Sequence, residues 1–373
     1  MTRALRTTAG LVGLVGLAAC GGGDGDGKPA AAAPAPPPPV VTVLASDLVR
    51  PRDLAFNSRI PDELWIVNGN GSVAIVHGAT NPKTAKTESR RDRNYLHFMP
   101  DPSSLAFGGD ATNLDALDPA LAPGTFATCQ ESRNGGDNLH AGNDFMGPVL
   151  WSSDLSIFAL KNGMLGSHLD MLHQSPLCMG IAWEGSGNVY WTFNGLARSI
   201  DRYDFQKDHG IGNDNHDDGL IHRFSAGQLG YVEGVPSHLA FRREESAVYL
   251  ADTGKGRVLK LTYEKARKLM PMPAKQDEAE SWIMADETLI EIVPAAAGIL
   301  TRPSGLEIHG DQLFVSDNAN GDIVRLSLSG TLIARYPTGV AAGGLAGLAF
   351  GPDDKLYFVD MVGNQVQRFD GPL

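Results

Sequence analysis

One segment recurs six times along the chain, and this repeat constrains the fold more than any other feature of the sequence. At residues 235–263 it reads VPSHLAFRREESAVYLADTGKGRVLKLTY. A Pro precedes an apolar-Ala-apolar run, a β-rich run ends in Asp, and a Gly-rich turn opens a third run. Such runs bounded by Gly, Asp and Asn are strand signals. The other copies lie at 51–77, 100–160, 176–205, 303–328 and 344–369. In the copy at 100–160 the third run is LSIFAL, at residues 155–160, which we expect to be the third strand of the second blade.

Repeats of this size predict a ring of blades. No 3.6-residue periodicity joins successive strands, which argues against βαβ units. A single blade leaves its two faces uncovered, whereas a ring of blades buries them and leaves only short edges. We therefore predict an all-β fold, a six-bladed β-propeller. Residues 41–45 (VTVLA) precede the first copy and the sixth copy lacks a fourth strand. We expect this N-terminal strand to complete the last blade.

The copies, among them RPRDLAF, ELWIVNGNG and SVAIVH, resemble NHL repeats over nearly all of residues 40–370. The resemblance implies a six-bladed propeller of the NHL or TolB-like type. DFMGPVLWSSD and HLDMLHQSPLCMGIAWE are also similar to a group of bacterial and algal NHL-propeller proteins that carry no assigned activity. Neither resemblance implies a mechanism.

Residues 1–19 have the composition of a signal peptide. Arg3 and Arg6 precede an apolar run that is too short and too rich in Gly and Ala for a bilayer-spanning helix. LAAC at residues 17–20 resembles a bacterial lipoprotein lipobox, which implies cleavage before Cys20 and acylation of that cysteine. By the same resemblance, Gly21 in place of Asp implies the outer membrane. The alternative is an ordinary secretory signal.

Residues 20–39 are rich in Gly, Ala and Pro and predict a tether that packs no core. The propeller then occupies residues 40–373. Without residues 1–19 the chain carries 29 basic and 43 acidic residues, a net charge of −14. This charge disfavours nucleic acid and anionic lipid headgroups as partners. The expected location is the bacterial cell envelope, as an outer-membrane lipoprotein that faces the periplasm or the cell surface.

Two further cysteines, Cys129 and Cys178, fall on neighbouring blades near the same face. An exported protein meets an oxidising compartment, so a disulfide between them is one reading. Two buried thiols are the other.

Two long loops are expected on one face of the ring. Strands of a blade alternate in direction, so loops before the first strand and after the second share a face, here called the upper face. Residues 130–147 and 161–177 fall there, and long loops on a rigid scaffold are where binding sites collect. The candidate ligand-binding residues from these loops are Glu131, Arg133, His140, Asp144, His168 and His173.

A second group of candidates lies just before each innermost apolar run. Asp53 and His238 occupy opposite blades there, so we expect a polar channel mouth that holds a metal, a water or a small polar ligand. A solvated funnel is the alternative. The ring as a whole consists of Asp53, Ser104, Gly180, His238, Gly305 and Gly347.

The opposite, lower face carries residues 204–219. Asp214, His216, Asp218 and Gly219 partly resemble the start of a calcium loop, so Ca²⁺ is the candidate ion, against a solvated acidic turn. The same assignment of faces separates His168 and His173 above from His209 and His216 below, which disfavours a zinc site. Residues 264–285 predict a polar, helical insertion in blade four.

Two functions are compatible with these patterns. The first is a lipid-anchored binding module for a protein, peptide or glycan near the membrane, which uses its upper-face loops. The second is a metal-dependent hydrolase or lyase at the channel mouth, lactonase-like or similar to an amidating lyase. In that lyase three His at the starts of inner strands hold zinc, and here only His238 occupies such a position.

Overall fold

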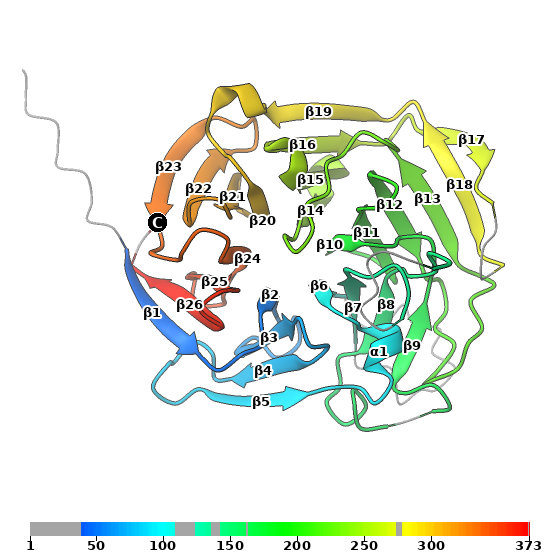
Figure 1. Ribbon diagram of the computed structural model, residues 1–373, viewed down its shortest axis with the longest axis horizontal. Helices are drawn as coiled ribbons and strands as arrows, with labels where there is room; N and C mark the ends of the chain where they lie inside the picture. Colours follow the sequence, from blue (N-terminus) through cyan, green and yellow to red (C-terminus); the bar gives the residue numbers. More distant parts are fainter. Residues whose placement is uncertain (1–38, 109–123, 136–141, 162, 274–277, 372) are drawn as a thin grey trace, which may run out of the picture. The chain divides into compact units, whose positions relative to one another are not determined.

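The computed structural model describes residues 39–108, 124–135, 142–161, 163–273, 278–371 and 373. Six sheets stand around a central axis as blades (Figure 1). The predicted all-β, six-bladed propeller is therefore confirmed. Cys20 and His140 lie outside the described residues.

The repeat fixes the strand order of each blade from the axis outward. The innermost strands begin at the repeat's Pro or apolar run and are β2 (Pro51–Phe56), β6 (Pro102–Phe107), β10 (Cys178–Trp183), β14 (Leu239–Arg242), β20 (Pro303–His309) and β24 (Leu345–Phe350). The second strands are β3 (Glu63–Asn68), β7 (Thr125–Gln130), β11 (Val189–Asn194), β15 (Ala247–Asp252), β21 (Gln312–Asp317) and β25 (Leu356–Asp360).

The third and fourth strands lie further out. The third strands are β4 (Val73–His77), β8 (Val149–Ser152), β12 (Ser199–Asp204), β16 (Arg257–Thr262), β22 (Asp322–Ser327) and β26 (Gln365–Asp370). The fourth strands are β5 (Lys86–Arg90), β9 (His168–Met171), β13 (Leu220–Phe224), β19 (Thr288–Val293), β23 (Leu332–Pro337) and, in the last blade, β1 (Val40–Ala45).

The N-terminal strand closes the ring, as predicted. β1 pairs antiparallel with β26 so that Val41 lies opposite Phe369. Thr42 Oγ1 donates to Asp370 Oδ2 at 2.5 Å, which ties the two ends of the described domain together. The last blade is thus completed by a strand from the other end of the sequence.

Aromatic side chains fill the space between neighbouring blades. Trp65 of blade one is fully buried and meets Phe126 of blade two edge-on at 4.9 Å between ring centroids. Its indole N–H donates to Glu63 Oε1 at 2.7 Å, which satisfies the one polar atom of the ring. Each sheet therefore buries both faces only because it has a neighbour on each side.

The expected third strand of blade two was wrong. LSIFAL at 155–160 forms turns, since Asp154 Oδ1 accepts the Ser156 N–H, and the strand is β8 instead. The fourth strand of the blade is then β9, within the segment expected to be an upper-face loop. His168 and Asp170 therefore belong to a strand at the outer edge of blade two.

The expected helical insertion at 264–285 was also wrong. The segment forms a hairpin of β17 (Arg267–Pro271) and β18 (Glu280–Ala285), in which Ser281 is buried and Ile283 packs against a core cluster, whereas Glu280 is exposed. β18 pairs in parallel with β13, so the hairpin extends the sheet of blade three.

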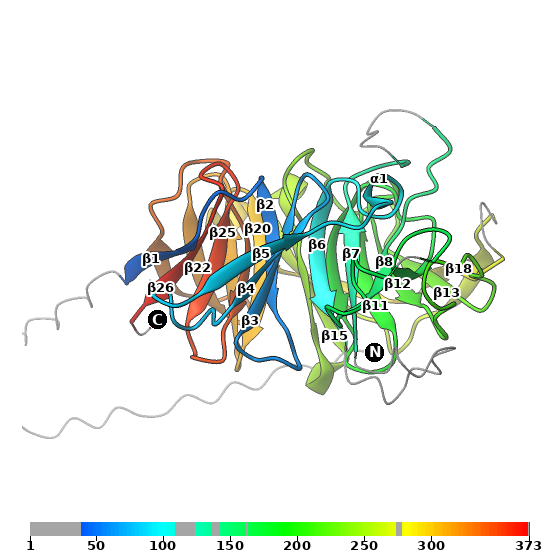
Figure 2. The same cartoon turned by 90° about the horizontal axis from the view of Figure 1, so that it is seen from below.

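The described residues contain one short α-helix, α1 (Tyr95–Phe98), beside the start of β6 on the upper face (Figure 2). They also contain three 3₁₀ turns, at Arg243–Glu245, Thr253–Lys255 and Ala295–Ala297. No described helix has the length and apolar character needed to cross a membrane.

Candidate functional site

The central channel holds a cavity of about 390 Å³. Its walls are successive levels of the innermost strands, and the first level contains Asp53 and His238. Below them, the repeat's apolar run supplies a level of Leu and Ile side chains. At the next level blade five carries Glu307 and each of the other five blades carries Ala. The last level is aromatic apart from one Ile: Phe56, Phe107, Trp183, Phe241, Ile308 and Phe350.

The cavity opens at the aromatic level, on the lower face. The six residues directly above the Asp53 level are all 0 % exposed: Arg52, Ser103, Met179, Ser237, Ser304 and Ala346. Most of the aromatic level, by contrast, is partly exposed. The sequence places Asp53 and His238 at a channel mouth. In the structure they lie at the inner end of a cavity that is reached from the opposite side.

Asp53 and His238 face each other across the channel. His238 Nε2–H donates to the carbonyl oxygen of Ser103 at 3.2 Å, so Nδ1 carries the lone pair and lies 3.4 Å from Asp53 Oδ1. The backbone N–H groups of Leu54 and Leu105 donate to the two carboxyl oxygens at 2.8 and 3.0 Å. A Cβ on Gly347 would lie 2.4 Å from Asp53 Oδ1, so glycine makes room for this carboxyl group.

The ionisable groups of the cavity are held neutral near pH 7. Burial raises the pKa of Asp53 to about 8, although the two backbone N–H groups act in the opposite direction. Burial and the nearby Asp53 raise the pKa of Glu307 to about 8. Burial lowers the pKa of His238 to about 4. No Lys or Arg is among the described residues that line the cavity.

Glu131 closes the upper end of the channel rather than pointing to solvent. Its Oε2 lies 2.6 Å from Nη2 of Arg52, and both side chains are almost fully buried. Its Oε1 accepts the Tyr231 hydroxyl at 2.6 Å and the Gly234 N–H at 2.7 Å. This network links blades one and two to the loop before blade four.

The other upper-loop candidates lie apart from the channel cavity. Arg133 Nη2 donates to Asp144 Oδ2 at 2.8 Å, an ion pair within the loop after β7. His173 is 7 % exposed, and its ring packs against Phe145 at 5.6 Å between centroids. Arg133, Asp144 and His173 are not among the residues that line the cavity.

The separation of the histidines into two faces was wrong. His168 lies on β9, and the loop at 205–219 from blade three folds back against this strand. The His209 N–H donates to the Leu169 carbonyl at 3.0 Å, and the Gly212 N–H donates to the His168 carbonyl at 2.8 Å. These contacts bring His168, Asp170, His209 and His216 together, with His216 Nδ1 2.9 Å from Asp170 Oδ1.

The calcium-loop candidates do not gather around one point. His216 turns toward Asp170, as described above. Asp218 Oδ2 accepts the Lys207 N–H at 3.2 Å, and Asp214 and Asp218 line a separate pocket of about 490 Å³. Among the described His, Cys, Asp and Glu side chains, the group that could share a metal is instead Asp170, His209 and His216.

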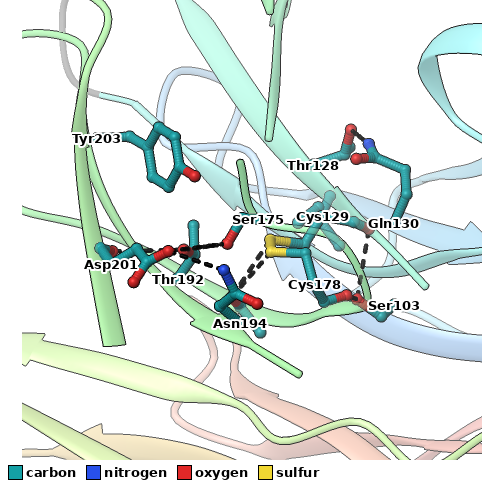
Figure 3. Close-up of a disulfide and its surroundings, with 12 residues drawn as sticks. Ser103, Thr128, Cys129, Gln130, Ser175, Cys178, Thr192, Asn194, Asp201 and Tyr203 are labelled. Atoms are coloured by element: carbon teal, nitrogen blue, oxygen red, sulfur yellow. Dashed lines mark hydrogen bonds between the residues drawn. A yellow bond between two sulfur atoms is a disulfide. The ribbon is translucent and has the colours of Figure 1, made fainter. Parts of the chain in front are cut away.

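A disulfide joins Cys129 of β7 to Cys178 of β10, with a Cα–Cα distance of 5.1 Å (Figure 3). It links blades two and three. The Ser103 hydroxyl lies beside it and is 2.6 Å from the Cys178 carbonyl oxygen.

Glu307 and His209 are the residues that sequence reasoning missed. Glu307 falls in the apolar run GLEI of the fifth repeat, at the position where Ala55 and Ala349 stand in the first and sixth. Alignment of the six copies by this run would have singled it out. His209 had no such signal, because its position depends on how a long loop folds back.

The sequence matches no protein-family model and no curated protein. Solved structures do resemble it. An auxiliary nutrient-binding protein from Bacteroides thetaiotaomicron is 10% identical with a TM-score of 0.53, over 86% of this chain and 68% of that one. Virginiamycin B lyase from Staphylococcus aureus is 12% identical with a TM-score of 0.50, over 89% and 99%.

The calcium-binding protein regucalcin from Agrobacterium tumefaciens is 13% identical with a TM-score of 0.51, over 89% of this chain and 94% of that one. At such low identities these neighbours show the fold alone. They include both binding proteins and enzymes. The chain is a six-bladed β-propeller, and the resemblance to NHL-type propellers is confirmed at the level of the fold.

Proposed function

We propose that this protein is an extracytoplasmic binding module, held to the membrane through Cys20 and the tether, that takes a small organic amine into the lower half of its channel. The observation that carries the proposal is the cavity, with Asp53 and Glu307 inside apolar walls. The upper-face loops are a weaker choice, because Glu131 and Arg133 are already engaged in ion pairs.

Charge selects the ligand class. Two carboxyl groups and no Lys or Arg line the described cavity. A cationic group that enters favours the ionised form of these carboxyl groups and gains an ion pair, whereas a carboxylate finds no positive charge to pair with. Partly exposed aromatic rings at the opening suit an apolar or aromatic body. The volume of about 390 Å³ lies in the range of small-molecule sites.

Calcium fits this cavity poorly. The ion takes roughly six to eight oxygen ligands. Asp53 and Glu307 are the only carboxylates among the described lining residues, and they lie at different levels.

Isothermal titration calorimetry with matched pairs of ligands tests the proposal. We expect phenethylamine and tryptamine to bind, and the carboxylates of similar shape, phenylacetate and indole-3-acetate, not to bind. Glu307→Ala removes a charge-assisted contact worth about 1.5–3 kcal/mol, so amine affinity should fall about 10- to 100-fold. The exposed Glu278→Ala is the control. Equal binding of amines and carboxylates, or an unchanged affinity in Glu307→Ala, would refute the proposal.

A hydrolase or lyase is the second candidate, favoured by the Asp53–His238 pair. A protonated carboxyl 3.4 Å from an imidazole lone pair can pass a proton to and from a bound substrate. Incubation with the neutral lactones dihydrocoumarin and γ-butyrolactone tests this function. Turnover that is lost in both Asp53→Asn and His238→Gln would support it, and unchanged lactones would count against it.

A further inference from the structure

A cluster of three imidazoles and one carboxyl group lies away from the channel, between the outer parts of blades two and three. Two members come from β9. His168 and Asp170 both lie on this strand and are buried. The other two, His209 and His216, come from the loop at 205–219 of blade three.

The backbone holds the loop in place against the strand. His209 N–H donates to the Leu169 carbonyl, Gly212 N–H to the His168 carbonyl, and Leu165 N–H to the Gly212 carbonyl, at 3.0, 2.8 and 3.1 Å. The cluster is therefore built on a fixed frame of main-chain hydrogen bonds.

Donor atoms of Asp170, His209 and His216 all lie within 4.8 Å of one another. The His168 ring is next to them, with its centroid 4.9 Å from that of His209. Imidazole nitrogen and carboxylate oxygen are the donors that zinc and neighbouring transition metals take, at about 2.0–2.2 Å. Calcium, by contrast, prefers an all-oxygen set.

Three buried atoms in this cluster have no hydrogen-bond partner. They are His168 Nε2, Asp170 Oδ2 and His209 Nε2, and their residues are 0 %, 0 % and 3 % exposed. A buried polar atom without a partner costs about 1–3 kcal/mol. A cluster that served only packing would therefore carry a large unexplained cost, whereas a cation held by Asp170 and His209 would satisfy the atoms of these two residues.

The opposite sides of the same groups are already positioned by the protein. His168 Nδ1–H donates to the Leu165 carbonyl at 3.1 Å, and His209 Nδ1–H donates to the Gly210 carbonyl at 2.7 Å. The Met171 N–H donates to Asp170 Oδ1 at 2.7 Å. Metal-binding histidines commonly donate their second nitrogen in this way, which fixes the tautomer with the lone pair on Nε2.

From this geometry we infer that Asp170, His209 and His216 bind one transition-metal ion of the zinc class, with His168 as the fourth ligand. Four protein ligands are typical of a structural site rather than a catalytic one. The ion would fasten the loop at 205–219 to blade two. This inference does not depend on the proposed ligand of the channel.

Metal loading of the mature full-length protein tests the site. The protein is stripped with EDTA, titrated with Zn²⁺ or Co²⁺, and measured by elemental analysis, Co²⁺ absorption and thermal unfolding. We expect one ion per chain, the absorption bands of four-coordinate Co²⁺ and a higher Tm in the loaded protein. His209→Gln and Asp170→Asn should each weaken Zn²⁺ binding at least about 100-fold, since even the loss of a partner behind a ligand costs about 10- to 100-fold.

His309→Gln is the matched control, because His309 lies in blade five and pairs with Asp354. It should leave Zn²⁺ affinity unchanged. Exposed Lys207 provides an independent readout, since cleavage by trypsin after this residue should slow when the metal fastens the loop. His209→Gln lies in a loop and decides the case if Asp170→Asn does not fold. Absence of bound Zn²⁺ and Co²⁺, or full affinity in His209→Gln, would overturn the inference.

Discussion

Replacement of Glu307 measures how much a carboxyl group in the channel lowers the free energy of unfolding. Replacement by Ala gives blade five the residue that the other five blades carry at this level, so the backbone accommodates it without strain. The side chain projects into an open cavity, so its removal leaves no packing defect. We expect Glu307→Ala to be more stable than the parent protein, by an amount that grows with pH.

The magnitude follows from the pKa of Glu307, which rises from 4.5 to about 8 on folding. An acid with a raised pKa binds more protons in the folded chain, so its effect is absent below pH 4.5 and destabilises the fold as pH rises toward 8. For this shift the cost is below about 1 kcal/mol at pH 5 and about 3 kcal/mol at pH 7. The second figure is an upper limit, because Glu307 is only partly buried.

Urea unfolding at pH 5, 6, 7 and 8, followed by tryptophan fluorescence, measures this difference in the free energy of unfolding. Asp53 is present in both proteins, so the comparison isolates Glu307 and its coupling to Asp53. Glu278→Ala, in an exposed segment, should match the parent protein at every pH. A Glu307→Ala protein that is less stable, or whose gain does not change with pH, would refute the reasoning.

Three further perturbations test the framework of the ring. Replacing Cys129 and Cys178 with Ala opens a covalent loop with a sequence separation of 49 and should cost about 4 kcal/mol, or roughly 6 °C in Tm by calorimetry. Arg52→Met leaves the buried Glu131 unpaired and should lower the free energy of unfolding by about 3–5 kcal/mol, with partial recovery on adding Glu131→Gln. Deleting residues 40–45 exposes the edge of β26, and we expect oligomers by size-exclusion chromatography, whereas a stable monomer would contradict the closure.

Most of the fold could be predicted from the repeat. The apolar run that begins at Leu54, and its counterparts in the other blades, marks the innermost strands because each needs small and apolar residues where six strands converge. The closing strand was equally visible, since one blade had three strands and one extra strand stood at the other end. Local sequence patterns were sufficient where strands that are adjacent in the sheet are also adjacent in the sequence.

The candidate sites were harder to predict, because they depend on which segment lies against which. Asp53 and His238 could be paired from the ring's symmetry, whereas the side from which they are reached follows from the burial of Arg52 and Ser103. The His216–Asp170 contact joins a loop of blade three to a strand of blade two. Nothing local to either segment indicates that pairing, since long-range main-chain hydrogen bonds create it.

The pairing of β1 with β26 also governs the order in which the ring can assemble. Thr42 and Asp370, which meet there, are 328 residues apart in the sequence. A chain that leaves the ribosome or a translocation pore from its N-terminus holds residues 40–45 without a partner until the last blade emerges. Five blades can stack before that moment, but the circle forms only at the final step. During this wait the unpaired strand is open to pairing with another chain. Rapid synthesis of the last blade shortens the wait and therefore reduces aggregation.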